Sequence, residues 1–335
     1  MSPVPADPAL VLAGLVLAHL VADFLLQTDT IVADKSAHGR RALRGLGFHG
    51  FGVAVCLVPF VALFAERGAA ALATITLGHV VVDRVKATAT RRAEARALAA
   101  AHARHAAPSA SAVALGAGWT PVPAALFALD QLAHGAILVS GWAAWLAGAA
   151  PTASAAEVVD RLIGGWDRAV VHDVALTAVV IAALAIVNIR AGALFVAILV
   201  HPREVVSGSA IPDDPVVSAP RASGWRIRLG PLEATADPVA AAKSSAPKDT
   251  RPAHASPARV GATIGVLERL LIATFVLTGS QAAIGFVVAA KTLARFKQLD
   301  DRDFAEYYLL GTLASVAVAL FSALLAAAAL ASLAR

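Results

Sequence analysis

The chain of 335 residues is 58% hydrophobic and only 15% charged, whereas a soluble domain carries about 25% charged residues. This composition excludes an ordinary soluble enzyme. The net charge of +5 is modest, and in a membrane protein it reports loop orientation, so we expect lipids and no nucleic acid as partners. The single cysteine, Cys56, excludes an internal disulfide and a cysteine-rich metal site.

Long, continuous apolar stretches predict transmembrane helices, because a helical span needs roughly 20 apolar residues. We predict an all-α polytopic membrane protein, a bundle of about six to seven transmembrane helices with a flexible cytoplasmic loop. The N-terminal MSPVPADPAL lacks a basic start, so we expect the first span to be retained and not cleaved as a signal peptide. The expected spans are 9–27, 46–64, 69–86, 122–147, 170–188, 262–290 and 306–333.

Three stretches between the spans have their own composition. Residues 88–110 are rich in Ala, Arg and His, and they predict a surface helix that is either solvated or bound to lipid headgroups. The apolar segment 191–200 is too short to span alone, so it is a re-entrant or interfacial piece, or it extends the fifth span after a kink near Asn188–Gly192. Residues 201–260 are rich in Pro, Ser, Ala and charge, which predicts disorder, and only GWRIRLG (224–230) alternates like a strand.

These features divide the chain into four parts. The expected parts are a four-helix membrane core over 1–147, a fifth span with the short apolar segment over 148–200, the disordered loop over 201–260, and a two-helix membrane hairpin over 261–335.

Lys and Arg residues set the expected orientation in a bacterial inner membrane. They are concentrated in 28–45 and 84–120, so the positive-inside rule places the N-terminus outside and puts 28–45, 84–120 and 201–260 in the cytoplasm. The basic loop 291–303 does not fit this rule with seven spans, because it would then face outward. If 191–200 completes another crossing, the C-terminal half inverts.

Three predicted spans carry a histidine and an aspartate four residues apart, and residues with this spacing share one helical face. The pairs lie in HLVAD (19–23), HVVVD (79–83) and DQLAH (130–134), and His49 opens the second span. The connectivity puts all these groups at a similar depth, near the cytoplasmic third, whichever way the bundle faces. The seven candidate metal ligands are His19, Asp23, His49, His79, Asp83, Asp130 and His134.

Charged side chains inside a bilayer cost at least about 2.5–3.5 kcal/mol each, so they face inward and usually mark function. A divalent cation would satisfy the seven groups, with Zn²⁺ first and Mn²⁺ or Fe²⁺ as alternatives. The seven candidate ligands are more than the four that one zinc ion binds. The cluster would therefore hold either two metals, or one metal with Asp–His partners that fix the histidine tautomer. The alternative is a set of polar groups that hold the helices together without an ion.

Other polar residues are candidates for supporting roles. Gln27 and Gln131 are either neighbours of the site or helix-end polar residues. Lys35 and Lys86 are candidates for holding a phosphate or headgroup, or serve as anchors at the membrane interface. Glu268 is a candidate extra ligand or base, and the adjacent His172 and Asp173 are expected to be ordinary residues of the opposite face.

The motifs HLVADFLLQTD, GHVVVDRVK and DQLAH, with Lys35 and His49 between them, resemble a bacterial integral-membrane family known as domain of unknown function 3307. The resemblance covers about residues 9–135, and two C-terminal stretches around AEYYLLGT and IGVLERLL look similar to the longer members. The resemblance implies a membrane protein but does not imply any particular activity. The H-x₃-D helices are also loosely similar to those of small integral-membrane proteins described as metal-dependent hydrolases.

These observations support three functional hypotheses. The first is a metal-dependent hydrolase of a lipid, lipid-linked or membrane-proximal substrate. Its ligands would be His19, His79 and His134 with Asp23, Asp83 or Asp130, and one leftover Asp would act as general base. The second is a metal- or proton-coupled transporter, and the third is a non-catalytic scaffold or sensor. The sequence names neither a substrate nor an oligomeric state.

Overall fold

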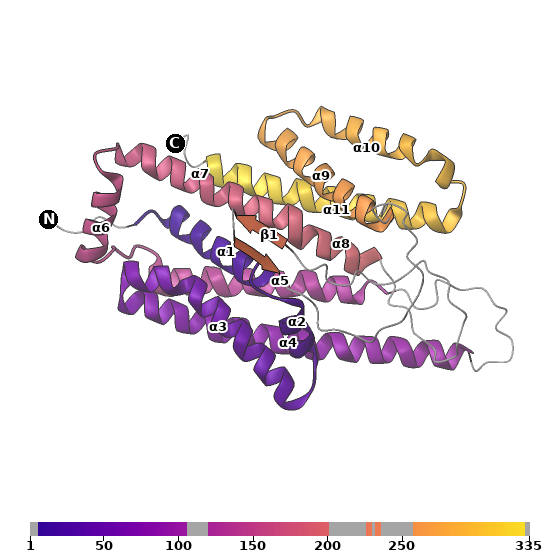
Figure 1. The fold of residues 1–335 in the computed structure, drawn as a ribbon, viewed down its shortest axis with the longest axis horizontal. Coiled ribbons are helices and arrows are strands. Elements are labelled where there is room, and N and C mark those ends of the chain that lie inside the picture. Colours follow the sequence, from indigo (N-terminus) through magenta and orange to yellow (C-terminus); the bar gives the residue numbers. More distant parts are fainter. Residues whose placement is uncertain (1–5, 106–119, 201–225, 230–231, 236–256, 332–335) are drawn as a thin grey trace. The chain divides into compact units, whose positions relative to one another are not determined.

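The computed structural model describes residues 6–105, 120–200, 226–229, 232–235 and 257–331 (Figure 1). Among these residues, five helical segments are long and apolar enough to cross a membrane. A sixth is formed if the first two helices, which meet at a bend of 83°, count as one span. The prediction of an all-α polytopic membrane protein is confirmed, with five or six spans by this measure in place of six to seven. The five segments are Gly39–Phe64, Glu66–Ala93, Val122–Leu146, Arg168–Val200 and Phe304–Leu330.

The N-terminal half is built from helices joined by short turns. The first helix begins where Asp7 caps it and Pro8 occupies its first turn, a position at which proline needs no hydrogen-bond donor. The second begins at the Thr28 cap. The elements are α1 (Pro8–Phe24), α2 (Asp29–Ser36), α3 (Gly39–Phe64), α4 (Glu66–His105), α5 (Val122–Gly141) and the π-helical turn η1 (Trp142–Leu146).

The third span and the predicted surface helix are one element. α4 runs without a break for 40 residues, so the basic stretch that was expected as a separate helix over 88–110 continues the span as far as His105. The remaining residues of that prediction lie outside the described part of the chain.

The fifth span is longer than predicted. α7 (Arg168–Ile186) continues through a π-helical turn, η2 (Val187–Ala191), into α8 (Gly192–Val200). The prediction of a re-entrant or interfacial segment at 191–200 is therefore wrong. The alternative prediction, that these residues extend the fifth span after a kink near Asn188, is confirmed. The short amphipathic α6 (Ala153–Ile163) precedes this span and ends at Gly164, which adopts the left-handed conformation with φ +62°.

The C-terminal part contains one more reversal than the sequence indicates. The single span expected over 262–290 is two helices, α9 (Pro257–Leu277) and α10 (Ala282–Ala294), which a turn containing Gly279 separates. A short 3₁₀ turn, η3 (Phe296–Gln298), then leads into α11 (Arg302–Leu330). Lys291 of α10 donates to Glu268 of α9 at 2.6 Å, so α10 folds back along α9.

This reversal places the basic connections at one end of the bundle. The ring of Phe127, near the start of α5, lies 6.4 Å from Phe24 at the end of α1 and 6.1 Å from Phe195 in α8. A Cβ built on Gly311, in the third turn of α11, would lie 3.4 Å from Val200, the last residue of α8. The first turns of α11, and the basic loop 291–303 before them, therefore lie toward the end of the bundle at which α8 ends. We call this the basic end; it includes Arg40, Arg41, Arg44, Arg84, Lys86, Arg91, Arg92, Arg295 and Lys297.

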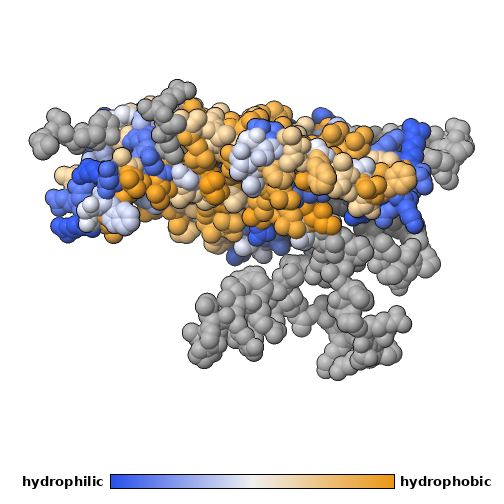
Figure 2. All heavy atoms as spheres, turned by 90° about the horizontal axis from the view of Figure 1, so that it is seen from above, coloured by the Kyte–Doolittle hydropathy of each residue, from blue (hydrophilic) through white to orange (hydrophobic). Residues whose placement is uncertain are grey.

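Two apolar cores hold the helices together. One lies among α1, α3, α4, α5 and η1, and the other lies among α7, α9 and α11, with Leu10 and Ala13 of α1 packed against it. α1 therefore joins the two halves. Hydrophobic residues cover most of the middle of the face seen in Figure 2, and hydrophilic residues gather toward its two ends, as expected for a bundle that crosses a bilayer.

A buried arginine ties the second half together. The π-helical turn exposes the carbonyl oxygen of Asn188, which accepts from Arg269 Nε at 2.7 Å. Arg269 Nη1 donates to Ser315 of α11 at 3.2 Å, and Asn188 donates its side-chain amide to Ser322 at 3.1 Å. Buried polar contacts of this kind hold helices together within a membrane.

The loop 201–260 lies mostly outside the described residues, and with it the predicted disorder. Among its described residues, β1 (Arg226–Leu229) pairs in antiparallel fashion with β2 (Leu232–Thr235), with Arg226 opposite Thr235. The strand predicted in 224–230 is therefore present.

At the end opposite the basic end, Asp7 and His172 join α1 to α7. Asp7 Oδ1 accepts from the Ala9 amide at 2.6 Å, and Asp7 Oδ2 lies 2.5 Å from His172 Nε2. Nδ1 of the same ring contacts Asp173 Oδ1 at 3.0 Å. His172 is therefore not the ordinary surface residue that was expected. Burial alone would raise the pKa of the Asp7 carboxyl, but hydrogen bonds from the Ala9 amide and from His172 outweigh burial and lower it.

We expect Asp7→Ala to destabilise the protein by about 1 kcal/mol, because this change removes a helix cap together with the contact to α7. Since its pKa is lowered in the folded protein, Asp7 stabilises the fold above the pKa of an ordinary aspartate, and the effect is lost as the pH falls through its folded pKa. Thermal unfolding of the two proteins in detergent should differ at pH 7 and converge in acid. Equal stability at neutral pH would contradict the role of this contact.

Candidate functional site

The seven predicted ligands come together inside the first half of the bundle. α1, α3, α4 and α5 supply them, and none of the seven side chains is more than 9% exposed. The pairs within one helix are separated as their four-residue spacing requires: 3.9 Å for His19 and Asp23, and 3.6 Å for each of the other two pairs. The sequence prediction that these groups share one depth agrees with this arrangement.

The tightest contacts join different helices. His49 Nε2 of α3 and His79 Nε2 of α4 lie 2.8 Å apart. Asp23 Oδ1 of α1 lies 3.2 Å from each of these nitrogens, and Asp83 Oδ2 lies 3.3 Å from His49 and 3.6 Å from His79. Two imidazole nitrogens at 2.8 Å cannot both direct lone pairs at each other, so a proton or a cation must lie between them.

These distances match the spacing of ligands around a metal. A tetrahedral zinc ion bound at about 2.0–2.1 Å separates its ligand atoms by about 3.3 Å. The five inter-atomic distances above run from 2.8 to 3.6 Å. Among the described residues, Asp23 Oδ1 has no hydrogen-bond partner although it is buried. Asp23 Oδ1 therefore lies close to both imidazole nitrogens without a hydrogen bond, as a ligand of a common ion would.

His134 is held in the tautomer that a metal ligand needs. Its Nδ1 lies 2.8 Å from the carbonyl oxygen of Asp130, and because a carbonyl oxygen only accepts, this nitrogen carries the proton. The other nitrogen, Nε2, then presents a lone pair, and it is buried with no partner in the described part of the chain. The His134 ring lies 4.1 Å from that of His79 and 5.0 Å from that of His19.

Two lysines neutralise two of the aspartates. Lys35 of α2 donates to Asp83 Oδ2 at 2.7 Å and to Gln27 Oε1 at 2.9 Å. Lys86 donates to Asp130 Oδ2 at 2.8 Å. With neutral histidines, three carboxylates face two ammonium groups, so one negative charge is left over. A buried charge of this kind requires a compensating cation or a proton on an imidazole.

Of the other polar candidates, Gln131 contacts the cluster and Glu268 does not. Gln131 Nε2 donates to Asp130 Oδ2 at 3.1 Å and so supports the site. Glu268 is not brought to the cluster, because its carboxylate pairs with Lys291 on α10. Of the adjacent charges in α9, it is Arg269 that is buried, at 2% exposure. The pairing of Lys35 with Asp83 and of Lys86 with Asp130 was missed, since neither follows from spacing along one helix.

Six of the seven ligands fall into three overlapping groups of donor atoms that lie within 4.8 Å of one another. Asp130 belongs to none of these groups. The groups are His19–Asp23–His134, Asp23–His49–His79 and His79–Asp83–His134.

Residues 11–162 match the family described as "Protein of unknown function (DUF3307)". This part of the chain, which is less than half of its length, is similar to the DUF3307 family. The resemblance seen in the motifs is thereby confirmed over these residues, whereas the similarity of the C-terminal stretches stays a prediction. No curated protein and no solved structure matches the chain.

The matched region holds the whole cluster. It includes most of α1, the elements from α2 to η1 and most of α6, and every predicted ligand lies within it. Lys35, Lys86 and both glutamines lie there as well, and Glu268 does not. The cluster therefore lies entirely within the part of this chain that resembles the family.

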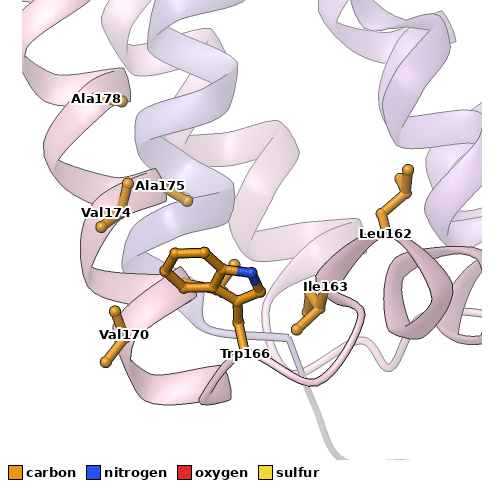
Figure 3. A pocket seen from close by; sticks show the side chains of 8 residues that line it. Leu162, Ile163, Trp166, Val170, Val174, Ala175 and Ala178 are labelled. Atoms are coloured by element: carbon orange, nitrogen blue, oxygen red, sulfur yellow. The ribbon is translucent and has the colours of Figure 1, made fainter.

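An apolar hollow of about 440 Å³ lies between α6 and the start of α7, at the end of the matched region. Trp166 lies alongside α7 near Val174 and Ala175 (Figure 3). None of the predicted ligands lines this hollow, and its lining side chains are apolar. The hollow is therefore separate from the cluster.

Proposed function

We propose that the protein is an integral-membrane, metal-dependent hydrolase that acts on a lipid or lipid-linked substrate. The observation that carries this proposal is the convergence of six buried His and Asp donors from four helices. Imidazole and carboxylate together suit Zn²⁺ best, with Mn²⁺ and Fe²⁺ as alternatives. The uncompensated carboxylate charge supports a bound cation.

The residues around the cluster fit hydrolysis. A divalent ion supplies Lewis acidity, which polarises the scissile group and acidifies water. Asp130 stands outside the three donor groups, and its Oδ1 is buried without a partner among the described residues, while Lys86 and Gln131 hold Oδ2. This leaves one fixed, free carboxylate oxygen that suits a general base.

The location of the cluster favours a one-sided site over a transport path. Beyond the cluster, the same helices pack an apolar core that includes Leu15, Val53, Leu57 and Ile75. The cluster lies toward the basic end, since Lys86 lies 5.0 Å from the Phe127 ring that marks it. By the positive-inside rule the basic end faces the cytoplasm and the N-terminus lies outside. A substrate held in the cytoplasmic leaflet would meet the site there.

Reconstituted protein tests this function. Vesicles of phosphatidylethanolamine and phosphatidylglycerol that contain a polyprenyl diphosphate should yield a cleaved lipid, detected by mass spectrometry, only when the protein holds metal. We expect Asp130→Asn to keep its metal and to lower the rate by about 100- to 10,000-fold, the usual contribution of a general base. Metal or proton flux across the vesicles without cleavage would favour a transporter, and Asp130→Asn at the full rate would refute this assignment of the base.

A further inference from the structure

Two of the three donor groups contain Asp23. One of them is His49, His79 and Asp23, and the other is His19, His134 and Asp23; the third group, His79–Asp83–His134, overlaps both. We call the two groups that contain Asp23 the first set and the second set. Each set draws its residues from different helices, α1 with α3 and α4 in one case, and α1 with α5 in the other.

A single ion does not use all of these donors. A zinc site takes four ligands, and the first set with Asp83 already offers four closely spaced atoms. His19 Nδ1 and His134 Nε2 are then left buried with no partner among the described residues. Two unpartnered polar nitrogens in a membrane interior are costly, so their burial calls for a second ion.

The second set is prepared to bind that ion. The contact of His134 Nδ1 with the Asp130 carbonyl directs the Nε2 lone pair into the cluster. The rings of His19 and His134 stack with 5.0 Å between their centroids and 25° between their planes. His19 Nδ1 lies 3.9 Å from Asp23 Oδ1. Asp23 has two carboxylate oxygens, so it is able to serve both sets.

We propose that the cluster holds two divalent ions, with Asp23 between them: one bound by His49, His79 and Asp83, the other by His19 and His134. This inference rests on the proposed metal site and adds a second ion to it. Two-metal centres separate their ions by about 3.5–4 Å and occur in phosphatases and nucleases, where the two ions stabilise the attacking and leaving oxygens, as well as in aminopeptidases. Together with the lipid substrate proposed above, the second ion favours phosphate-bearing lipids.

Metal content decides between one ion and two. The full-length protein, purified in detergent, is loaded with Zn²⁺ and desalted, and zinc per chain is measured by elemental analysis. We expect about two ions per chain in the wild type. We expect about one in His134→Gln, in His19→Gln and in His49→Gln, and less than one in Asp23→Asn, which affects both sets. His172→Gln, at the opposite end of the bundle, is the matched control and should keep two.

Loading with Mn²⁺ provides a second measurement, an electron paramagnetic resonance spectrum, in which loss of one ion differs from loss of all metal by misfolding. Two manganese ions that share a carboxylate should show an exchange-coupled electron paramagnetic resonance spectrum, and His134→Gln should convert it to that of an isolated ion. A wild type that saturates at one ion, or a His134→Gln that keeps the wild-type content, would overturn the second ion and leave the proposed function intact. No retained metal in the wild type would overturn both.

Discussion

Replacing His79 with alanine is expected to remove most of the bound metal. His79 belongs to two of the three donor groups. Its Nε2 lies 2.8 Å from that of His49 and 3.2 Å from Asp23 Oδ1. Loss of an outer partner of a ligand alone costs 10- to 100-fold in metal affinity, so the loss of this ligand should cost at least about 100-fold. Zinc binding, measured by competition with a chromophoric chelator in detergent, gives the affinity directly.

The control for His79→Ala is His172→Ala, which removes an imidazole at the opposite end of the bundle. This variant should bind zinc as the wild type does. Gel filtration and thermal unfolding of the metal-free proteins show whether His79→Ala is folded. A folded His79→Ala with unchanged zinc affinity would exclude the ligand set proposed above, and with it the hydrolase.

Replacing Gly45 with alanine is expected to destabilise the protein by about 2 kcal/mol, a typical cost of overpacking. A Cβ at this position would lie 2.5 Å from the Lys35 backbone nitrogen and 2.7 Å from Asp34 Cβ. The obstacle includes backbone, so α2 would have to move away from α3. Lys35 would move with α2 and lose its contact with Asp83.

Gly47, two residues along the same helix, is the matched control. A Cβ there would meet no atom of the described structure within 4 Å, and alanine favours a helix over glycine by roughly 1 kcal/mol. Gly47→Ala should therefore raise the thermal midpoint in detergent, and Gly45→Ala should lower it. A Gly45→Ala protein as stable as the wild type would show that α2 does not pack against α3 as described.

The motifs predicted which polar side chains converge better than the hydropathy predicted the spans. The pairs in α1, α4 and α5 and the lone His49 meet, as their common depth requires. The chain reversal at Gly279 was missed because residues 262–290 were taken as one apolar span, although the polar stretch 278–281 (TGSQ) within them is a turn signal. The extension past Asn188 was left open because a π-helical turn leaves no signal in the apolar pattern.

The pairings between helices depend on how the helices are rotated and how closely they approach. Gly50 of α3 would place a Cβ 2.8 Å from Val80, and Gly141 of α5 would place one 2.6 Å from Ile75. Such close contacts bring α3 and α5 against α4, so that His49 and His134 reach His79. Lys35 reaches Asp83 because α2 turns by 83° from α1. A turn of this kind is not encoded in the spacing of any single helix.

The sequence by itself determined which residues share a helical face, because the α-helical repeat fixes that spacing wherever the chain is helical; hence the three pairs at 3.6–3.9 Å. Only the tertiary structure decided which faces meet. The shorter contacts, 2.8 Å between His49 and His79 and 3.2 Å from each to Asp23, come from helix packing, which depends on side chains far apart in the sequence. The same packing decided that Lys35 and Lys86 pair with Asp83 and Asp130, and that Asp23 has no lysine partner among the described residues.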